Sequence, residues 1–332
     1  PYAKDRNPQG GTSFHKFAGA NRDLPMIMKE LYPEPDLEVI GAPTGNDTTI
    51  FPGMLSTRDP MYDRAQRNTE IMLLDAVDVQ IANGPTYDAA SGRWSVQVKV
   101  TNNSGHRIPT GYPDGRRFWV ELQVTDAAGL IYESGHYDQE SATLFTDSAM
   151  TGFNRAREPF IDSSSNAVMV YERVTGTCTN GGTLIFPDPN TNTPENCTPS
   201  PALTNNFILF DNRLLPAGFD YARLRDAGVK FWNYGADMVP YEDTDRYPSG
   251  QNWDLVTYTF DAPADAVLTA RAEVYWQTHT REFMEHLRDQ DVSTYRPEGP
   301  PDILDPNYPL NPTYLSEVID LVLRSFARHA SR

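Results

Sequence analysis

Alternating apolar and polar positions dominate the middle of the chain. Between residues 93 and 101, Trp94, Val96, Val98 and Val100 alternate with polar residues, which predicts a strand with one buried face. Similar runs bounded by turn residues predict further strands at Val77–Ala82, Phe118–Thr125, Leu130–Glu133, Ala167–Val174, Phe207–Phe210, Leu255–Phe260 and Val267–Gln277. The residues Asn83–Gly92 are expected to form a polar hairpin loop. About eight strands with turn-rich links predict a mainly β fold, an antiparallel β-sandwich.

A helical period appears only near the edges of this β region. Asp59-Pro60 is a helix start signal, and the residues that follow predict a helix to Asp75. A short helix is expected near Leu24–Leu31, another at Thr280–Asp289, and an amphipathic one at Tyr314–His329. The last has apolar residues at helical spacing: Leu315, Val318, Ile319, Val322, Leu323 and Phe326.

These patterns predict three parts of the chain. Residues 1–60, rich in Pro, Gly and Asp, are expected to form an extended arm that contacts another domain or partner. Residues 61–290 are expected to form the β-sandwich domain. Residues 291–332 are expected to form a linker and the packing helix.

Composition narrows the class of partner. The 332 residues include 45 acidic and 28 basic ones, a formal charge of −17, which argues against nucleic acid and anionic membranes. The same charge is compatible with calcium, with basic partners or with solubility alone. No apolar run approaches the roughly 20 residues of a membrane helix, so we expect no membrane insertion. The sequence begins at Pro1 rather than Met, so we expect processing or truncation upstream.

The chain has two cysteines, Cys178 and Cys197, on either side of a polar loop. Such a loop buries little apolar surface, so a covalent closure would supply order that packing does not. We therefore expect a structural disulfide and an oxidising compartment. Two free thiols or a metal-binding pair are the alternatives, but no further Cys or His lies close by in the sequence.

Four segments of the chain resemble one family. They are SFHKFAGAN at Ser13–Asn21, NNSGHRIPTGYPDGRRFW and the DAAGLIYESG that follows it within Asn102–Gly135, DNRLLPAGF within Phe210–Phe219, and VLTARAEVYWQTHTREFMEHL at Val267–Leu287. The residues of these segments and their order along the chain resemble the haem-free, C-terminal β-rich region of extracytoplasmic multihaem c-type cytochromes. The chain departs from those proteins in lacking any Cys-x-x-Cys-His haem-attachment motif.

The resemblance implies a haem-free accessory domain or subunit that shields and positions haems in an electron-transfer complex. Its partner would be a haem-bearing cytochrome segment or subunit, and assembly into a larger complex or filament is compatible with that role. The cofactor would be haem c, contacted but not covalently attached by this chain. The location would be extracytoplasmic: periplasmic, at the cell surface or extracellular.

Two histidines are candidate haem contacts. His15 lies in the arm between Phe14 and Phe17, and imidazole is a common ligand of low-spin haem iron. The resemblance implies that His15 supplies the distal ligand of a haem carried by another segment; the alternative is an exposed loop histidine. His106 lies in a turn, where a ring nitrogen could bond a backbone carbonyl, with a haem or metal contact as the alternative.

Arg116 and Arg117 introduce a predicted strand, so at least one side chain should point inward and need an anionic partner. We expect a structural ion pair with Glu133 or Asp211, and a clamp on a haem propionate is the alternative. The segment Asp211-Asn212-Arg213 is expected to form a turn built from side-chain-to-backbone hydrogen bonds.

No sequence motif supports catalysis. The chain contains no His-Glu-x-x-His, no phosphate-binding glycine loop and no Gly-x-Ser-x-Gly elbow, so we expect no enzyme activity from this chain by itself. Calcium is a further candidate ion, in the oxygen-rich loops Asp188–Asn192 and Glu242–Asp245. The alternative function is a stand-alone extracellular module that binds carbohydrate or a protein surface through the aromatic stretch Trp232–Trp253. These aromatic residues could equally pack against one another inside a long loop.

Overall fold

The computed structural model describes residues 19–26, 58–138, 143–144, 168–184, 198–199, 205–228, 232–234, 240–242, 247–280, 283 and 330–331. The chain divides into two compact units, residues 1–72 and residues 73–332. The predicted Tyr314–His329 helix and nearly all of the predicted arm lie outside the described residues, as does most of the Thr280–Asp289 helix. Within the described part, no helix is long and apolar enough to cross a membrane.

In the first unit, the segment Gly19–Met26 is organised by local polar contacts. The Asn21 side chain accepts the Leu24 N–H at 2.9 Å, at the start of a helical turn. Arg22 donates to Glu70 at 2.9 Å and to Asp23 at 3.1 Å. Glu70 lies on α3 (Arg58–Ala76), which confirms the helix predicted at Asp59–Asp75.

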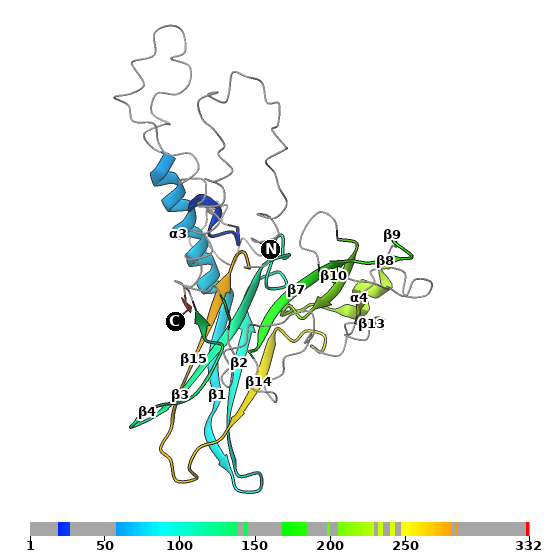
Figure 1. Cartoon of the computed structure of the whole chain (residues 1–332). Coiled ribbons are helices and arrows are strands. Elements are labelled where there is room, and N and C mark those ends of the chain that lie inside the picture. The colour runs from blue at the N-terminus through cyan, green and yellow to red at the C-terminus, as the bar shows by residue number, and fades with distance from the viewer. Residues whose placement is uncertain are drawn as a thin grey trace, which may run out of the picture. The chain divides into compact units, whose positions relative to one another are not determined.

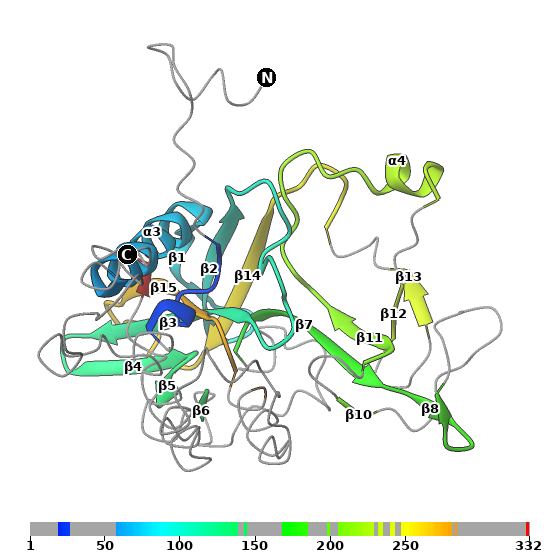
Figure 2. The same ribbon diagram turned by 90° about the horizontal axis from the view of Figure 1, so that it is seen from above.

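The second unit is mainly β, and its sheets are antiparallel, as predicted (Figure 1). One sheet has the order β1-β2-β14, and its strands are β1 (Val77–Asp88), β2 (Arg93–Asn102) and β14 (Trp253–Phe260). The other sheet has the order β10-β7-β3-β15-β16, with β11 also paired to β7 and β4 to β3. Its strands are β3 (Arg117–Asp126), β4 (Gly129–Ser134), β7 (Val170–Thr177), β10 (Thr198–Pro199), β11 (Phe207–Asp211), β15 (Thr269–Gln277) and β16 (Ala330–Ser331). Figure 2 shows β2 beside β14 and β7 beside β11.

Short elements complete the description. Three small hairpins pair β5 (Tyr137–Asp138) with β6 (Thr143–Leu144), β8 (Thr179–Asn180) with β9 (Thr183–Leu184), and β12 (Trp232–Tyr234) with β13 (Pro240–Glu242). Helix α4 (Tyr221–Asp226) begins at Asp220, whose carboxylate accepts the Arg223 N–H at 3.2 Å. A carboxylate at this position satisfies a main-chain donor that the helix itself leaves open.

The hydrophobic core lies between the two sheets. The alternation along β2 buries Val96, Val98 and Val100 completely, and β3 contributes Val120 and three further apolar residues to the same cluster. Fully burying one such aliphatic or aromatic side chain is worth about 1.5–3 kcal/mol. This shared core between two antiparallel sheets confirms the predicted sandwich.

A second, smaller core covers the outer face of β3, where Trp119, Tyr137, Leu144, Val168 and Val170 pack together. The Trp119 indole donates to the Gly135 carbonyl at 2.9 Å. Gly135 has φ +87°, and a Cβ there would meet the Val120 carbonyl oxygen, so only glycine fits. Part of the outer face of β3 is therefore buried as well.

The predicted hairpin is present, but its loop is shorter than the predicted Asn83–Gly92 and comprises residues 89–92. Strand β1 continues to Asp88 and remains paired with β2, with register shifts between Ile81 and Asn83 and between Asn83 and Thr86. The shifts absorb the Asn83-Gly84-Pro85 sequence as bulges, which cross-strand pairing on either side holds in place.

Candidate functional site

The loop that joins β2 to β3, residues 103–116, is held by several buried polar contacts, and the first of them involve Asn102. The Asn102 side chain is fully buried and donates to the carbonyls of His106 at 2.7 Å and Leu214 at 3.0 Å. Its oxygen accepts the Ser104 N–H and hydroxyl, both at 2.8 Å. The Asn102 amide group therefore bonds both to the turn itself and to the segment that contains Leu214.

The loop is then paired with the segment that follows β11. Ile108 and Leu214 exchange main-chain hydrogen bonds of 3.0 Å in both directions, and both side chains are buried. The Arg213 guanidinium reaches the Pro109 carbonyl at 3.4 Å. Two segments a hundred residues apart in sequence thus form one structure.

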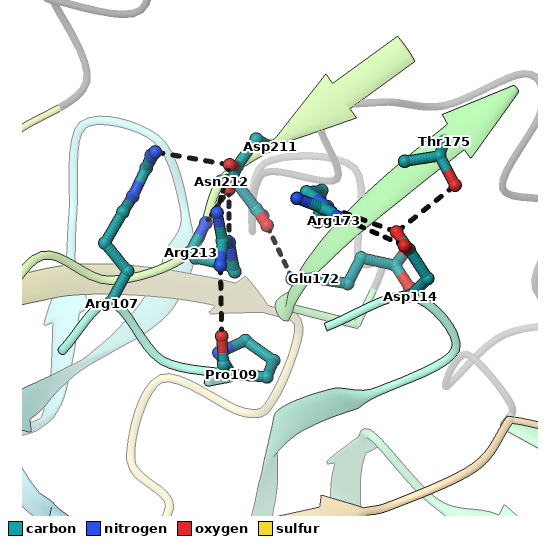
Figure 3. Close-up of polar contacts among 9 residues, drawn as sticks. All are labelled: Arg107, Pro109, Asp114, Glu172, Arg173, Thr175, Asp211, Asn212 and Arg213. Carbon is teal, nitrogen blue, oxygen red and sulfur yellow. Dashed lines mark hydrogen bonds and ion pairs between the residues drawn. The ribbon is translucent and has the colours of Figure 1, made fainter. Parts of the chain in front are cut away.

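Charge neutralisation at this junction centres on Asp211, which is 5% exposed (Figure 3). Arg213 donates to both carboxylate oxygens, Nε at 2.9 Å and Nη2 at 2.7 Å, and Arg107 Nη1 lies 3.2 Å from Oδ2. Burial would raise the pKa of Asp211, but the Arg213 hydrogen bonds and the charges of Arg107 and Arg213 outweigh it, so the pKa lies below its ordinary value. Asp211 is therefore ionised inside the domain at neutral pH.

Asp114 forms a second ion pair in the same place. Arg173 of β7 donates Nε to Oδ1 at 3.1 Å and Nη2 to Oδ2 at 2.8 Å, and the Thr175 hydroxyl is 3.2 Å from Oδ1. A parallel β-bridge joins Asp114 and Arg173 through the main chain. We call Asp114, Arg173, Asp211, Arg107 and Arg213 the arginine–aspartate network.

Asn212 connects the two ion pairs to the sheet. Its side-chain oxygen accepts the Glu172 N–H at 2.7 Å, and its amide nitrogen donates to the Val170 carbonyl at 2.6 Å. The Asn212 carbonyl accepts the buried Tyr247 hydroxyl at 3.0 Å. The predicted turn at Asp211–Arg213, built from side-chain hydrogen bonds, is therefore extended by long-range bonds.

Arg116 and Arg117 are both buried. Arg116 Nη1 donates to the Thr110 carbonyl at 2.6 Å, while Arg117 Nε donates to Gln277 at 2.6 Å and its guanidinium lies 5.6 Å from the Trp119 ring centre. Arg117 also faces Glu172 across the β3–β7 pairing. Of the carboxylates that we expected to neutralise them, Asp211 contacts Arg107 and Arg213, and Glu133 contacts Gln123 and His136. The expected ion pairs of Arg116 and Arg117 therefore stay predictions.

Among the other sequence candidates, His106 has an exposed side chain. Its turn contacts come from the main chain, whose carbonyl accepts from Asn102 and Ser104. Cys178 is fully buried, and Asn206 holds its main chain through bonds of 2.8 Å to both N–H and carbonyl. His15 and Cys197 lie outside the described residues, so the haem ligand and the disulfide stay predictions.

A row of carboxylates lies on the outer face of β3 and its neighbours. Glu121 on β3 and Glu273 on β15 face each other directly in the ladder, and the Tyr275 hydroxyl donates to Glu273 at 3.1 Å. Gln123 donates to Glu121 at 2.9 Å and to Glu133 on β4 at 2.8 Å. We call Glu121, Glu133 and Glu273 the glutamate row.

Burial is the main reason that the pKa of Glu121 is raised, and the charges of Glu133 and Glu273 add to it against a hydrogen bond from Tyr275. Burial and the charges of Glu121 and Glu273 raise the pKa of Tyr275 in turn. In the part of the chain that the structure describes, no group of three His, Cys, Asp or Glu side chains could hold a metal ion. Of the two candidate calcium loops, Asp188–Asn192 lies outside that part, as do residues 243–245.

The aromatic stretch Trp232–Trp253 is described only in part. Tyr247 is 2% exposed and belongs to the main core, whereas Trp253 is half-buried, with the Lys99 ammonium 5.1 Å from its ring centre. The Tyr247 ring therefore serves as packing for the loop.

Sequence reasoning did not identify Asn102, Asp114 or Arg173 as part of this site. The available signal was the pair Glu172-Arg173 inside an otherwise apolar strand, since charges in a buried strand require partners.

No protein-family model matches the chain, and no curated protein matches it. Among solved structures, the chain is similar to a penta-heme cytochrome c552 from Thermochromatium tepidum, with 16% sequence identity and a TM-score of 0.34. The match covers 68% of this chain and 38% of the cytochrome, so this chain spans well under half of that protein. A TM-score of this size does not establish a shared fold.

Proposed function

We propose that this chain is a haem-free accessory part of an extracytoplasmic multihaem cytochrome, where it shields and positions haems for electron transfer. The observation that carries the proposal is that sequence segments resembling the cytochrome family contact one another in the structure. The segments Asn102–Gly135 and Phe210–Phe219 contact each other directly. Arg107 forms an ion pair with Asp211, and the Arg213 side chain donates a hydrogen bond to the Pro109 carbonyl. Two sequence segments that resemble the same family thus belong to one structural unit.

A third resembled segment, Val267–Leu287, joins the same unit. Its strand β15 pairs with β3 along nine residue pairs, and the Thr280 N–H donates to the Gly115 carbonyl at 2.7 Å. The Phe283 ring packs against Gly115 so closely that a Cβ there would lie 2.5 Å from the ring. Three of the four segments that resemble the cytochrome family therefore contact one another in this fold. Their contacts support our proposal that the resemblance reflects a common structural unit.

In this proposal the chain has no catalytic role of its own. The side chains that could have served as acids, bases or anion ligands at the junction bond one another: Asp211 with two arginines and Asp114 with Arg173 and Thr175. Such compensated charges stiffen a scaffold and hold a loop in one conformation. A rigid haem-free scaffold is what an accessory domain contributes to a chain of haems.

The haem contact that we propose is His15, which would donate its imidazole to the iron of a haem attached to another segment or subunit. Iron–imidazole bonds are about 2 Å long. The chain itself has no Cys-x-x-Cys-His segment, so the haem c would be contacted but not covalently attached. Phe14 and Phe17 beside His15 would pack against the macrocycle edge.

The test is to isolate this chain from its native host under non-denaturing conditions and record an absorption spectrum. We expect a co-purifying haem-bearing polypeptide with a low-spin spectrum. His15→Ala should convert one haem of that complex to a five-coordinate, high-spin form, whereas His136→Ala, at an exposed position on the β region, should leave the spectrum unchanged. Native material with neither haem nor haem-bearing partner would rule out the proposal.

A further inference from the structure

The strand β14 forms one edge of the three-stranded sheet, and it pairs with β2 along its whole length without a register shift. In an antiparallel edge strand, alternate residues direct their main-chain groups to the neighbouring strand, and the others direct theirs away from the sheet. The outward-facing residues of an edge strand can pair with another chain.

Side-chain contacts identify the outward-facing residues of β14. The Leu255 N–H donates to Asp254 Oδ1 at 2.9 Å, and the Thr259 carbonyl accepts from Arg93 Nη2 at 3.2 Å. The Trp253 carbonyl likewise accepts from Gln251 Nε2 at 2.8 Å. These contacts are made by odd-numbered residues, so Leu255, Thr257 and Thr259 face away from β2.

Some outward groups remain open. Over the described residues, the Leu255 carbonyl, both main-chain groups of Thr257 and the Thr259 N–H make no hydrogen bond. The Leu255 side chain, on the outer face of the sheet, is 41% exposed. An open stretch of strand backbone therefore centres on Thr257.

Two other strands, β1 and β15, carry features that discourage pairing with another chain. Strand β1 contains two register shifts, and β15 carries Arg271 and Glu273 and also pairs with β16. The sequence WDLVTYTF of β14 has no Pro, Lys or Arg and is rich in β-branched and aromatic residues. Bulges, charges and covering strands are the usual protection of an edge. Along β14 the charged groups are Asp254, beside the Leu255 N–H, and Arg93 of β2, at the Thr259 carbonyl, and neither contacts the main chain of Thr257.

We propose that β14 pairs antiparallel with β14 of a second copy of this chain, about a two-fold axis at Thr257. In that register the Thr257 N–H of each copy donates to the Thr257 carbonyl of the other. The Thr259 N–H of each copy donates to the Leu255 carbonyl of the other. These are the main-chain groups that make no hydrogen bond within the described residues of the single chain. The Leu255 N–H and the Thr259 carbonyl already have hydrogen-bond partners and need not bond to the second copy.

The side chains are compatible with the same register. On the outer face, Thr257 lies opposite its counterpart and Leu255 lies opposite Thr259 of the second copy, so no like charges meet. The contact would cover the exposed Leu255 side chain and continue the β1-β2-β14 sheet from one copy into the other. This pairing is independent of the haem-related role proposed above.

The first experiment measures the mass of the purified full chain by light scattering at high protein concentration. We expect twice the mass of one chain, and the mass of one chain for Thr257→Lys, which places two ammonium groups face to face on the axis. The matched control Gln80→Lys adds the same charge at an exposed position of β1 in the same sheet and should stay dimeric. A monomeric wild type, or a Thr257→Lys variant that stays dimeric, would overturn the proposal.

The second experiment tests the register and does not depend on the lysine variants. Thr257→Cys places two thiols opposite each other, within the 4.4–6.8 Å Cα separation that a disulfide spans, so mild oxidation should give a covalent dimer. Leu255→Cys alone should not cross-link, because its counterpart lies four residues further along the strand, but a mixture with Thr259→Cys should. Cross-linking of Leu255→Cys to itself would show a different register and contradict the proposed axis.

Discussion

Asp211 and Glu121 are both withdrawn from water, but their surroundings differ in the sign of the nearest charges. Asp211 lies between Arg107 and Arg213, and its pKa is lowered although it is 5% exposed. Glu121 lies opposite Glu273, with Glu133 nearby, and its pKa is raised although it is less buried. Burial raises the pKa of both carboxyl groups, and only at Asp211 do neighbouring arginines outweigh it, so the partners decide the direction of the net shift.

The same contrast separates the two faces of the sheet. The arginine–aspartate network joins a loop to strands β7 and β11, so its charges serve a long-range connection. The glutamate row joins neighbouring strands that already share a ladder. Gln123 and Tyr275 donate to its members, and the exposed side chains of Arg271 and His136 contact Glu273 and Glu133. The buried carboxylates of the loop junction are thus paired with arginines, whereas the basic partners in the glutamate row are exposed side chains.

Removal of Asp211 should have the largest effect. Asp211→Ala leaves Arg107 and Arg213 inside the domain without their shared anion, and breaking such a pair costs about 3–5 kcal/mol. We expect that loss in urea unfolding at neutral pH, followed by far-UV circular dichroism. Asp265→Ala, at an exposed position of the β14–β15 loop, is the control and should lose less than about 0.5 kcal/mol. Equal losses for both variants would show that the buried pair adds nothing.

Asn212→Ala should have the next largest effect. It removes the hydrogen bonds to the Glu172 N–H and the Val170 carbonyl, both inside the sheet, and the loss of a buried polar partner costs about 1–3 kcal/mol. The change is neutral in charge, so it separates the structural connection from ion pairing. Asn103→Ala, at an exposed position of the β2–β3 loop, should unfold like the wild type in the same urea titration.

The strands could be predicted because their pattern is local. The alternation around Val96 and Val98 identified β2, and Phe118–Thr125 identified β3 within two residues at each end. The loop predicted at Asn83–Gly92 was too long because the turn residues Asn83, Gly84 and Pro85 are held as bulges by a partner strand. Local propensity carries no information about such a partner.

The site was much less predictable. Arg107 and Asp211 are separated by more than a hundred positions, and their pairing depends on the register of Ile108 with Leu214. The contacts of Asp211 with Arg107 and Arg213 could not be predicted from the sequence, and the ion pairs suggested for Arg116 and Arg117 stay predictions. Charged residues in the sequence show that partners are needed, and only the fold decides which ones.

Replacement of Glu121 should have a smaller effect of opposite sign. Glu121→Gln removes one of two like charges that face each other across β3 and β15, and such pairs destabilise by about 0.2–1 kcal/mol, with screening by solvent keeping the value low. We expect the variant to be slightly more stable than the wild type at pH 7 in thermal unfolding. Thr125→Val, an uncharged change on the same strand, should show no pH-dependent difference.

The pH dependence should separate the two carboxylates. Because the folded pKa of Glu121 is raised, its ionisation destabilises the folded state as pH rises from the unfolded value, about 4.3, through the folded one. The advantage of Glu121→Gln should therefore vanish near pH 4 and grow toward neutrality. Asp211 has a lowered pKa, so its contribution is complete above about pH 4 and falls as pH drops through the folded value. The Asp211→Asn defect should accordingly shrink in acid, and a defect unchanged at pH 2 would contradict the ion-pair interpretation.

The smallest effect is expected at His106, in the loop that the network holds. Its ring is exposed, and the turn contacts of this residue come from its carbonyl, which His106→Ala retains. We expect a change in unfolding free energy within about 0.5 kcal/mol, as for surface positions without special contacts. Asn102→Ala, one end of the same turn, should instead cost about 1–3 kcal/mol because its buried amide serves the His106 and Leu214 carbonyls. A large loss for His106→Ala would mean that the imidazole itself holds the turn; an unchanged fold together with an altered haem spectrum in the native complex would identify His106 as a contact to the partner.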